Sequence, residues 1–200
     1  MRHRIFIAIN LPKEIKEVLI QKIKKIEESF NFYKEEFSSS GPIRWVKPDN
    51  LHLTLAFLGY VKDEDLSKII EIVEEISKKH SPFSVNFLKI SYSEPKHKIP
   101  RMIWVVCEKN KELFNLQENL KKSLLSFGVT DLETERDFLP HITLARIKKW
   151  EFKKIDPEEV PEVNEPLNLS FEVKSIEIME SHLKREGAEY TILESCPLKE

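Results

Sequence analysis

Apolar and polar residues along this chain follow two spacings in turn, that of strands and that of helices. The wholly apolar run at residues 5–9 is typical of a short buried strand. Between Lys13 and Glu28, apolar residues instead recur at intervals of three or four, which predicts a helix with one buried face. Charged residues of alternating sign fill the opposite face of this helix, which we interpret as solvated.

The same two spacings predict the other elements. Strands are expected at residues 44–46, 51–58, 83–92, 102–107, 142–147, 169–179 and 189–193, and helices at residues 63–79 and 111–127. Gly128 is placed to end the second of these helices. Loops are expected at residues 38–42 and 94–100, and the acidic, proline-containing stretch 148–166 is interpreted as a long surface excursion.

This order of elements occurs twice. The strand, long helix, loop and strand of residues 5–58 correspond to the strand, helix, loop and strand of residues 102–147. Because strands and helices do not alternate strictly, the predicted fold class is α+β, with two sheets and helices outside them. We expect a single domain over residues 1–200 with an internal duplication.

Each half of the predicted duplication contains the same short motif, His-x-Thr-Leu. The motif begins at His52 in the first half and at His141 in the second. Residues i and i+2 of a strand point to the same face, so His52 projects beside Thr54 and His141 beside Thr143. One such pair is most simply the polar face of a half-buried strand. Two pairs at corresponding places indicate a functional site.

Two imidazoles and two hydroxyls suit a displacement at phosphorus. Imidazole titrates near neutrality, so one histidine can accept a proton from water while the other donates one to the leaving oxygen. Threonine hydroxyls can donate hydrogen bonds to the non-bridging phosphate oxygens, where charge accumulates. A cyclic phosphodiester needs no nucleophile from the protein. Neither motif has a second histidine or a carboxylate at metal-ligand spacing, so we predict no metal and no cofactor.

Composition and charge narrow the classes of function further. The formal net charge is -2, so no global positive field attracts long nucleic acid, and an RNA substrate would be held locally at one end. Cys107 and Cys196 form no paired motif, as expected in a reducing cytosol. The apolar runs are too short for a signal peptide or a membrane span. We therefore expect a cytoplasmic protein with no membrane role.

Beyond the two motifs, the sequence resembles a known family over nearly its whole length. The resemblance is carried by residues 4–9, 44–55, 57–59, 101–104 and 136–146, and by Ser181, Gly187, Tyr190 and Leu193. On these residues the chain is similar to the two-histidine phosphoesterases. Within that superfamily it most resembles the bacterial and archaeal RNA 2',3'-cyclic phosphodiesterases, also called 2'-5' RNA ligases.

The resemblance implies a fold and a reaction. The fold would have two pseudo-symmetric lobes, each an antiparallel sheet with helices on its outer face, and an active-site cleft between them. The reaction would be hydrolysis of an RNA 2',3'-cyclic phosphate end to a 2'-phosphate, with His52 as proton donor and His141 as proton acceptor. The motifs alone do not distinguish these two roles, because they are chemically alike.

The resemblance also implies a reverse, ATP-independent joining to 5'-hydroxyl RNA. The expected partner is RNA with a 2',3'-cyclic phosphate end, tRNA halves being one candidate, and the expected state is a monomer. Residues 94–100 and 148–166 depart from the usual pattern of the family. Both segments could touch the substrate, so the RNA preference stays open.

For several residues near the motifs, the sequence does not distinguish a structural role from a binding role. Arg146 lies five residues after His141, which in an unbroken strand points it to the opposite face, so phosphate binding requires the strand to end or bulge first. The family has a phosphate-binding arginine here, and we favour that role. Other residues left open are Phe6, Trp45, Arg101, Arg136 and Tyr190. The remaining histidines are interpreted as surface residues: His3, His80, His97 and His182.

Three other functions remain in competition with RNA-end hydrolysis. A close variant would act on small cyclic nucleotides or ADP-ribose cyclic phosphate. A protein that binds nucleotide or RNA without turnover is the second, although both His-Thr pairs are intact. A metal-dependent hydrolase is the third, and inhibition by EDTA would reveal it.

Overall fold

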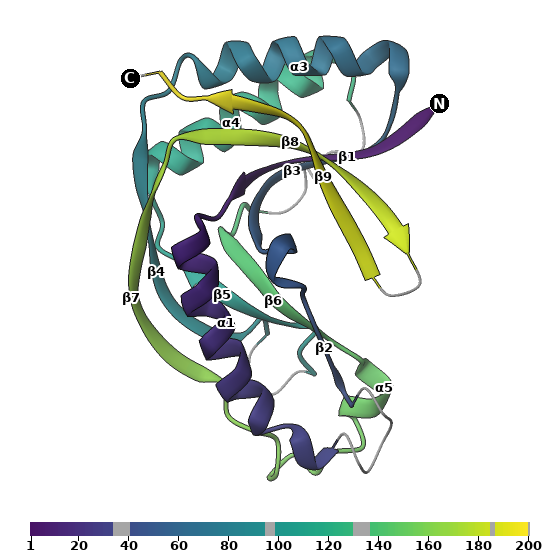
Figure 1. Cartoon of the computed structure of the whole chain (residues 1–200), viewed down its shortest axis with the longest axis vertical. Coiled ribbons are helices and arrows are strands. Elements are labelled where there is room, and N and C mark those ends of the chain that lie inside the picture. The colour runs from purple at the N-terminus through teal and green to yellow at the C-terminus, as the bar shows by residue number, and fades with distance from the viewer. Residues whose placement is uncertain (34–40, 95–98, 130–136, 185–186, 200) are drawn as a thin grey trace.

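The computed structural model of the protein describes residues 1–33, 41–94, 99–129, 137–184 and 187–199. Its strands are all antiparallel and form one hydrogen-bonded sheet in the order β7-β4-β5-β6-β3-β1-β8-β9, with β2 paired to β6 (Figure 1). The strands are β1 Arg2–Asn10, β2 Ile43–Trp45, β3 His52–Lys62, β4 Phe83–Tyr92, β5 Met102–Cys107, β6 His141–Ile147, β7 Asn164–Val173, β8 Ser175–Lys184 and β9 Gly187–Pro197. The helices are α1 Lys13–Glu28, the 3-10 turn η1 Pro48–Asn50, α3 Asp63–Ser77, α4 Lys111–Phe127 and α5 Lys149–Phe152.

The sheet consists of two halves that meet between β3 and β6. One half contains β7, β4, β5 and β6, and the other contains β3, β1, β8 and β9. The halves are paired in register at Leu53 and Ile142, both fully buried. The α+β class is confirmed, and the two antiparallel sheets that we expected are joined into one through this narrow contact.

Helices cover one face of the β3-β1-β8-β9 half. Helix α3 packs on β3, β8 and β9, and α4 packs on α3 and β3. Helices α1 and α4 begin and end at the predicted residues, and Gly128 ends α4 with a φ of 102°. None of the described helices is long and apolar enough to cross a membrane.

Residues 5–9 of β1 are buried on both faces, as expected for a strand with a neighbour on each side. Ile5, Ile7 and Ile9 face the main core. The residues between them face the other way, where Phe6 and Ala8 form a small cluster with Met179. This second face of β1 is the one that continues to the two histidine motifs.

The prediction of one strand over residues 169–179 was wrong. Two strands, β7 and β8, occupy this region and lie at different positions in the sheet order. The backbone passes from one to the other at Lys174 and stays extended, as Figure 1 shows along the side and top of the sheet. No glycine or proline marks the junction, but the alternation of apolar residues changes phase between Val173 and Ile176. A single strand over residues 169–179 does not account for this change of phase.

The expected surface excursion over residues 148–166 was wrong in part. Its middle is exposed, but Phe152, Ile155 and Val163 are buried in the core, and β7 begins at Asn164. The Tyr92 hydroxyl also donates a hydrogen bond to the carbonyl oxygen of Pro161 at 2.8 Å. Three widely spaced apolar residues are enough to anchor the segment, although its composition is mostly acidic.

Substitution of Leu53 by alanine tests the junction between the halves. We expect the free energy of unfolding to fall by about 2–5 kcal/mol, because the change leaves a cavity in a packed contact. Urea denaturation measures this loss. The matched control is Leu88→Ala on β4, where the side chain is 49% exposed and a loss of about 0.5 kcal/mol or less is expected. Equal losses in the two variants would contradict the role given to Leu53.

Candidate active site

The β3–β6 register brings the two His-x-Thr motifs together. Because the strands are antiparallel and Leu53 pairs with Ile142, the register sets His52 towards Thr143 and Thr54 towards His141. All four polar side chains are half-buried, whereas the residues between them are fully buried. The two motifs therefore share one face of the sheet in a twofold-like arrangement.

Both imidazoles are oriented by the same kind of hydrogen bond. The Nδ1 atom of His52 lies 2.6 Å from the carbonyl oxygen of Asn50, and that of His141 lies 2.7 Å from the carbonyl oxygen of Leu139. A carbonyl oxygen can only accept, so Nδ1 carries the proton in both rings. The Nε2 atoms are then the ones that can exchange a proton, and that of His52 lies 3.0 Å from the Thr54 hydroxyl.

The two imidazoles differ in what packs against them. The His52 ring lies between Phe6 and Tyr190, with ring centroids 5.0 and 5.3 Å away. The His141 ring packs on Trp104 at 4.4 Å. The sequence does not single out Trp104, because residues 102–107 are all apolar and their pattern assigns no residue to either face.

Burial makes both imidazoles harder to protonate in the free protein. It lowers the pKa of His52 to about 4, against the opposing effect of the hydrogen bond to Asn50. Burial also lowers the pKa of His141 below its ordinary value of 6.5. Both histidines are therefore mostly neutral near pH 7 in the free protein.

A bulge in β6 returns Arg146 to the side of the histidines. Ile103 pairs with Ala145 and Trp104 with Thr143, so Leu144 is an extra residue in β6. Leu144 and Ala145 are both buried and Arg146 is exposed. The positive charge of Arg146 contributes to the low pKa of His52. On the sequence alone, Arg146 requires a bulge of this kind to bind phosphate. Phosphate binding by Arg146 stays a prediction.

Lys16 is a site residue that the sequence did not reveal. It is half-buried, its pKa is lowered by that burial, and its charge lowers the pKa of His52. Its Nζ donates a hydrogen bond to the carbonyl oxygen of Asp49 at 3.2 Å. The prediction that this face of α1 is solvated is wrong at Lys16. Nothing in the uniform charge pattern of α1 distinguishes this lysine from its neighbours.

The structure places most of the other residues whose roles the sequence does not decide. Trp45 packs against the core, and Arg101 is exposed with its Nε 3.0 Å from Glu94. His3 is not a free surface residue, because it hydrogen-bonds to Glu180 and Asp63. Arg136 and His97 lie outside the described residues, as do parts of the loops expected at residues 38–42 and 94–100.

The described residues contain no group of three or more histidine, cysteine, aspartate or glutamate side chains that could hold a metal ion. Cys107 is buried, and burial raises its pKa to about 12. A thiol with that pKa is not ionised near neutrality. The imidazoles, hydroxyls and cations around the β3–β6 junction are thus the reactive groups of this face.

Fold and site together define an α+β protein with one His-x-Thr motif on each side of the β3–β6 junction. The family described as "LigT like Phosphoesterase" matches the chain twice, over residues 9–104 and 105–190. A curated relative from Thermotoga maritima, named RNA 2',3'-cyclic phosphodiesterase, is 33% identical over 96% of this chain and 94% of its own length. A relative of the same name from Aquifex aeolicus is 30% identical over 86% of this chain and 90% of its own.

A solved structure is similar over the whole fold. The crystal structure of TT0787 of Thermus thermophilus has a TM-score of 0.81 and 26% identity, with 98% of each chain covered. The protein described here belongs to the LigT-like phosphoesterase family, a branch of the two-histidine phosphoesterases, and it is an enzyme.

The low pKa of His52 predicts a particular dependence of stability on pH. In the unfolded chain the pKa of His52 has its ordinary value of 6.5, whereas in the folded chain it is about 4. The stability that neutral His52 contributes is therefore complete above pH 6.5 and is lost as the pH falls towards 4. We expect the loss to be about 3 kcal/mol at most, since one pKa unit corresponds to about 1.4 kcal/mol.

Denaturation of wild type and His52→Asn across this pH range measures the effect. Asparagine does not titrate, so the variant should lose less stability on acidification than wild type does. Parallel stability curves for the two proteins would show that His52 is not held neutral by its surroundings.

Proposed function

We propose that this enzyme hydrolyses the 2',3'-cyclic phosphate ends of RNA to 2'-phosphate ends, with two histidines and no metal. The observation that carries the proposal is the pair of imidazoles with Nδ1 held by backbone carbonyls and Nε2 left to exchange protons. The names of the Thermotoga and Aquifex relatives support the substrate. A strained cyclic diester already contains its leaving group, so two proton transfers and positioned donors are sufficient chemistry.

The proposed reaction is a single displacement by water. The Nε2 of His141 accepts a proton from water as the water oxygen attacks phosphorus. The bond between phosphorus and O3' breaks, and the Nε2 of His52 donates a proton to O3'. The products are a 2'-phosphate and a free 3'-hydroxyl, and proton exchange with solvent restores both imidazoles. This assignment of donor and acceptor follows the resemblance to the family.

A bound phosphate explains how a histidine with a low pKa can act as an acid. The negative charge of the phosphodiester favours protonation of a nearby imidazole. In the apolar surroundings of Phe6 and Tyr190, His52 then loses that proton readily to a developing alkoxide. The same burial that keeps His52 neutral in the free protein makes its protonated form a strong donor.

The remaining polar groups would bind the phosphate itself. Thr54 and Thr143 would donate hydrogen bonds to the two non-bridging oxygens, one from each half of the sheet. Arg146 would hold the same oxygens with two parallel N–H groups, a geometry that favours arginine over lysine.

We also propose that the same site can carry out the reverse reaction, ATP-independent joining of RNA ends. A 5'-hydroxyl of RNA could take the place of water and attack the cyclic phosphate, which would form a 2'-5' linkage. The energy comes from the strained ring, so no ATP is required. The same two proton transfers would serve this reaction.

We also propose that the chain is one two-lobed domain that arose by internal duplication. The two matches to the same family and the repeated order of strand, helix and motif strand support this origin.

Alanine substitution of either histidine tests the mechanism. We expect His52→Ala and His141→Ala each to lower kcat by about 10²–10⁴-fold, which is typical for removal of a general acid or base. The measurement is turnover of a short RNA with a 2',3'-cyclic phosphate end in the presence of EDTA, with the product end mapped. His80→Ala, a histidine remote from both motifs, is the control. Full activity in either variant would remove that histidine from the mechanism, and loss of wild-type activity in EDTA would contradict the metal-free reaction.

Substitution of Arg146 tests the phosphate contact. Arg146→Gln should lower kcat/KM by about 10–100-fold, as expected for the loss of a hydrogen bond to a charged group. Arg146→Lys should restore only part of that loss, because lysine cannot form the two parallel bonds. The matched control is Arg101→Gln, at an arginine already paired with Glu94. If Arg146→Gln behaves like this control, Arg146 has a structural role instead.

A further inference from the structure

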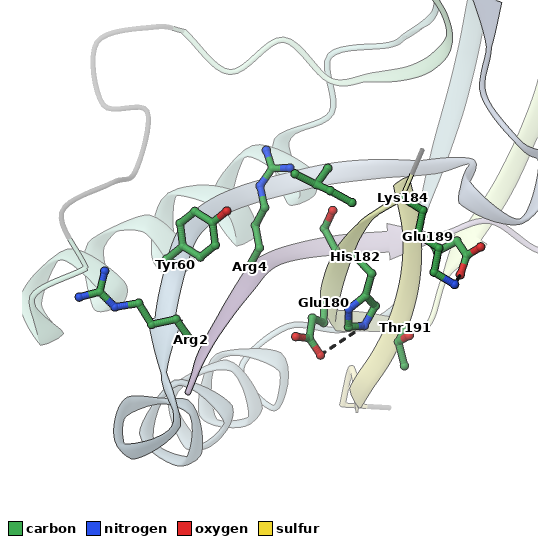
Figure 2. Close-up of a pocket in the computed structure, with 10 residues that line it drawn as sticks. Arg2, Arg4, Tyr60, Glu180, His182, Lys184, Glu189 and Thr191 are labelled. Atoms are coloured by element: carbon green, nitrogen blue, oxygen red, sulfur yellow. Dashed lines mark ion pairs between the residues drawn. The ribbon is translucent and has the colours of Figure 1, made fainter. Parts of the chain in front are cut away.

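A notch opens where β1 and β8 separate. These two strands pair only from Ile5 with Glu180 to Ala8 with Glu177, so the ends of both strands beyond this ladder diverge. Between them lies a hollow of about 630 Å³. Arg2 and Arg4 of β1 and Tyr60 of β3 form one wall, and β8 and β9 form the other (Figure 2). We call this hollow the β1–β8 notch.

The carboxylates of the notch are already paired. Glu180 lies 2.7 Å from the Nδ1 of His3 and 3.5 Å from the Nε2 of His182, the second contact being the dashed line in Figure 2. Glu189 forms an ion pair with Lys184. Lys184 therefore offsets the charge of Glu189, and both oxygens of Glu180 face imidazole nitrogens rather than the two arginines.

The two arginines of the notch are not paired. Within the described part of the chain, neither Arg2 nor Arg4 forms an ion pair, and both side chains are exposed. They lie two positions apart on one face of β1, at a separation of about 6–7 Å along the strand. Exposed apolar groups lie beside them, since Tyr60 is 63% and Leu183 is 68% exposed.

Aromatic rings connect the notch to the histidine site. Arg4 is on the same face of β1 as Phe6, because strand residues alternate. The Phe6 ring lies 5.0 Å from His52 and 6.0 Å from Phe57, and Phe57 is half exposed. Tyr190, which packs on His52, pairs in register with Ser181 of the notch. Packed aromatic rings thus lead from His52 towards the strand that carries the two arginines.

We propose that the β1–β8 notch binds the RNA strand upstream of the cyclic phosphate end. Arg2 and Arg4 bind successive backbone phosphates, and the exposed ring of Tyr60 stacks on a base. Free cations along a groove with interleaved aromatic rings are how single strands are bound without sequence preference. The inference rests on the proposed function and extends it, because it makes an RNA chain the preferred substrate over a cyclic mononucleotide, which would leave the notch empty.

A second hollow offers a matched control. It has a volume of about 270 Å³ and is lined by Arg101 and Lys149, among others. It also contains two cations, but Arg101 is paired with Glu94, so it attracts an anion less strongly. The RNA strand is therefore expected in the β1–β8 notch and not in this second hollow.

The test compares a short and a long substrate in wild type and in two double variants. Adenosine 2',3'-cyclic phosphate and an adenosine octanucleotide with the same cyclic end are hydrolysed by wild type, by Arg2→Gln/Arg4→Gln and by Arg101→Gln/Lys149→Gln. In Arg2→Gln/Arg4→Gln, the ratio of kcat/KM for the octanucleotide to that for the mononucleotide should fall by about 10–100-fold. The Arg101→Gln/Lys149→Gln variant should keep the wild-type ratio.

Salt dependence gives a second readout. Each phosphate contact with a single strand contributes about 0.7 to the slope of log affinity against log salt concentration. The slope for the octanucleotide should therefore be shallower by about 1.4 in Arg2→Gln/Arg4→Gln than in wild type.

An unchanged ratio and slope in Arg2→Gln/Arg4→Gln would overturn the inference, as would an equal or greater loss in Arg101→Gln/Lys149→Gln. If wild type hydrolyses neither substrate, the proposed function fails as well. Hydrolysis of both by wild type with no effect of the notch variant would overturn this inference alone.

Discussion

Leu53 and Ile142 pair in antiparallel register where the two halves of the sheet meet. The two histidines, the two threonines and Arg146 all lie within four residues of this pair. The register sets each histidine towards the threonine of the other motif, and the bulge at Leu144 brings Arg146 to the same side. A shift of one strand by one residue would turn its motif into the core, where an unpaired imidazole would be costly. Leu53 and Ile142, the apolar residues inside the two motifs, thus position the site as much as its polar residues do.

Two motifs of the same sequence acquire different properties from their surroundings. His52 lies between two aromatic rings, whereas His141 contacts one, and burial lowers the pKa of both. The backbone carbonyl at Nδ1 is common to the two, so the rings share a tautomer and an orientation. An acid and a base can therefore arise from one motif by differences in packing and in distance from a bound phosphate.

Much of this organisation could be predicted from sequence because it depends on local spacing. Helices α1 and α4, the cap at Gly128 and the two motif strands all follow from periodicity and turn chemistry. Contacts between distant segments could not be predicted in the same way. The approach of Lys16 to His52 depends on how α1 packs near η1, and the change of partner at Lys174 occurs within an unbroken extended segment. The family resemblance supplied roles that spacing alone left ambiguous.

The central claim is that a bound phosphate converts two neutral imidazoles into one acid and one base. NMR titration of the two histidine rings with adenosine 2'-monophosphate bound tests it most directly. The account predicts that the pKa of His52 rises above neutrality in the complex while that of His141 stays below its ordinary value. If neither pKa rises on binding, His52 has no proton to donate at neutral pH, and the acid–base account of the site is contradicted.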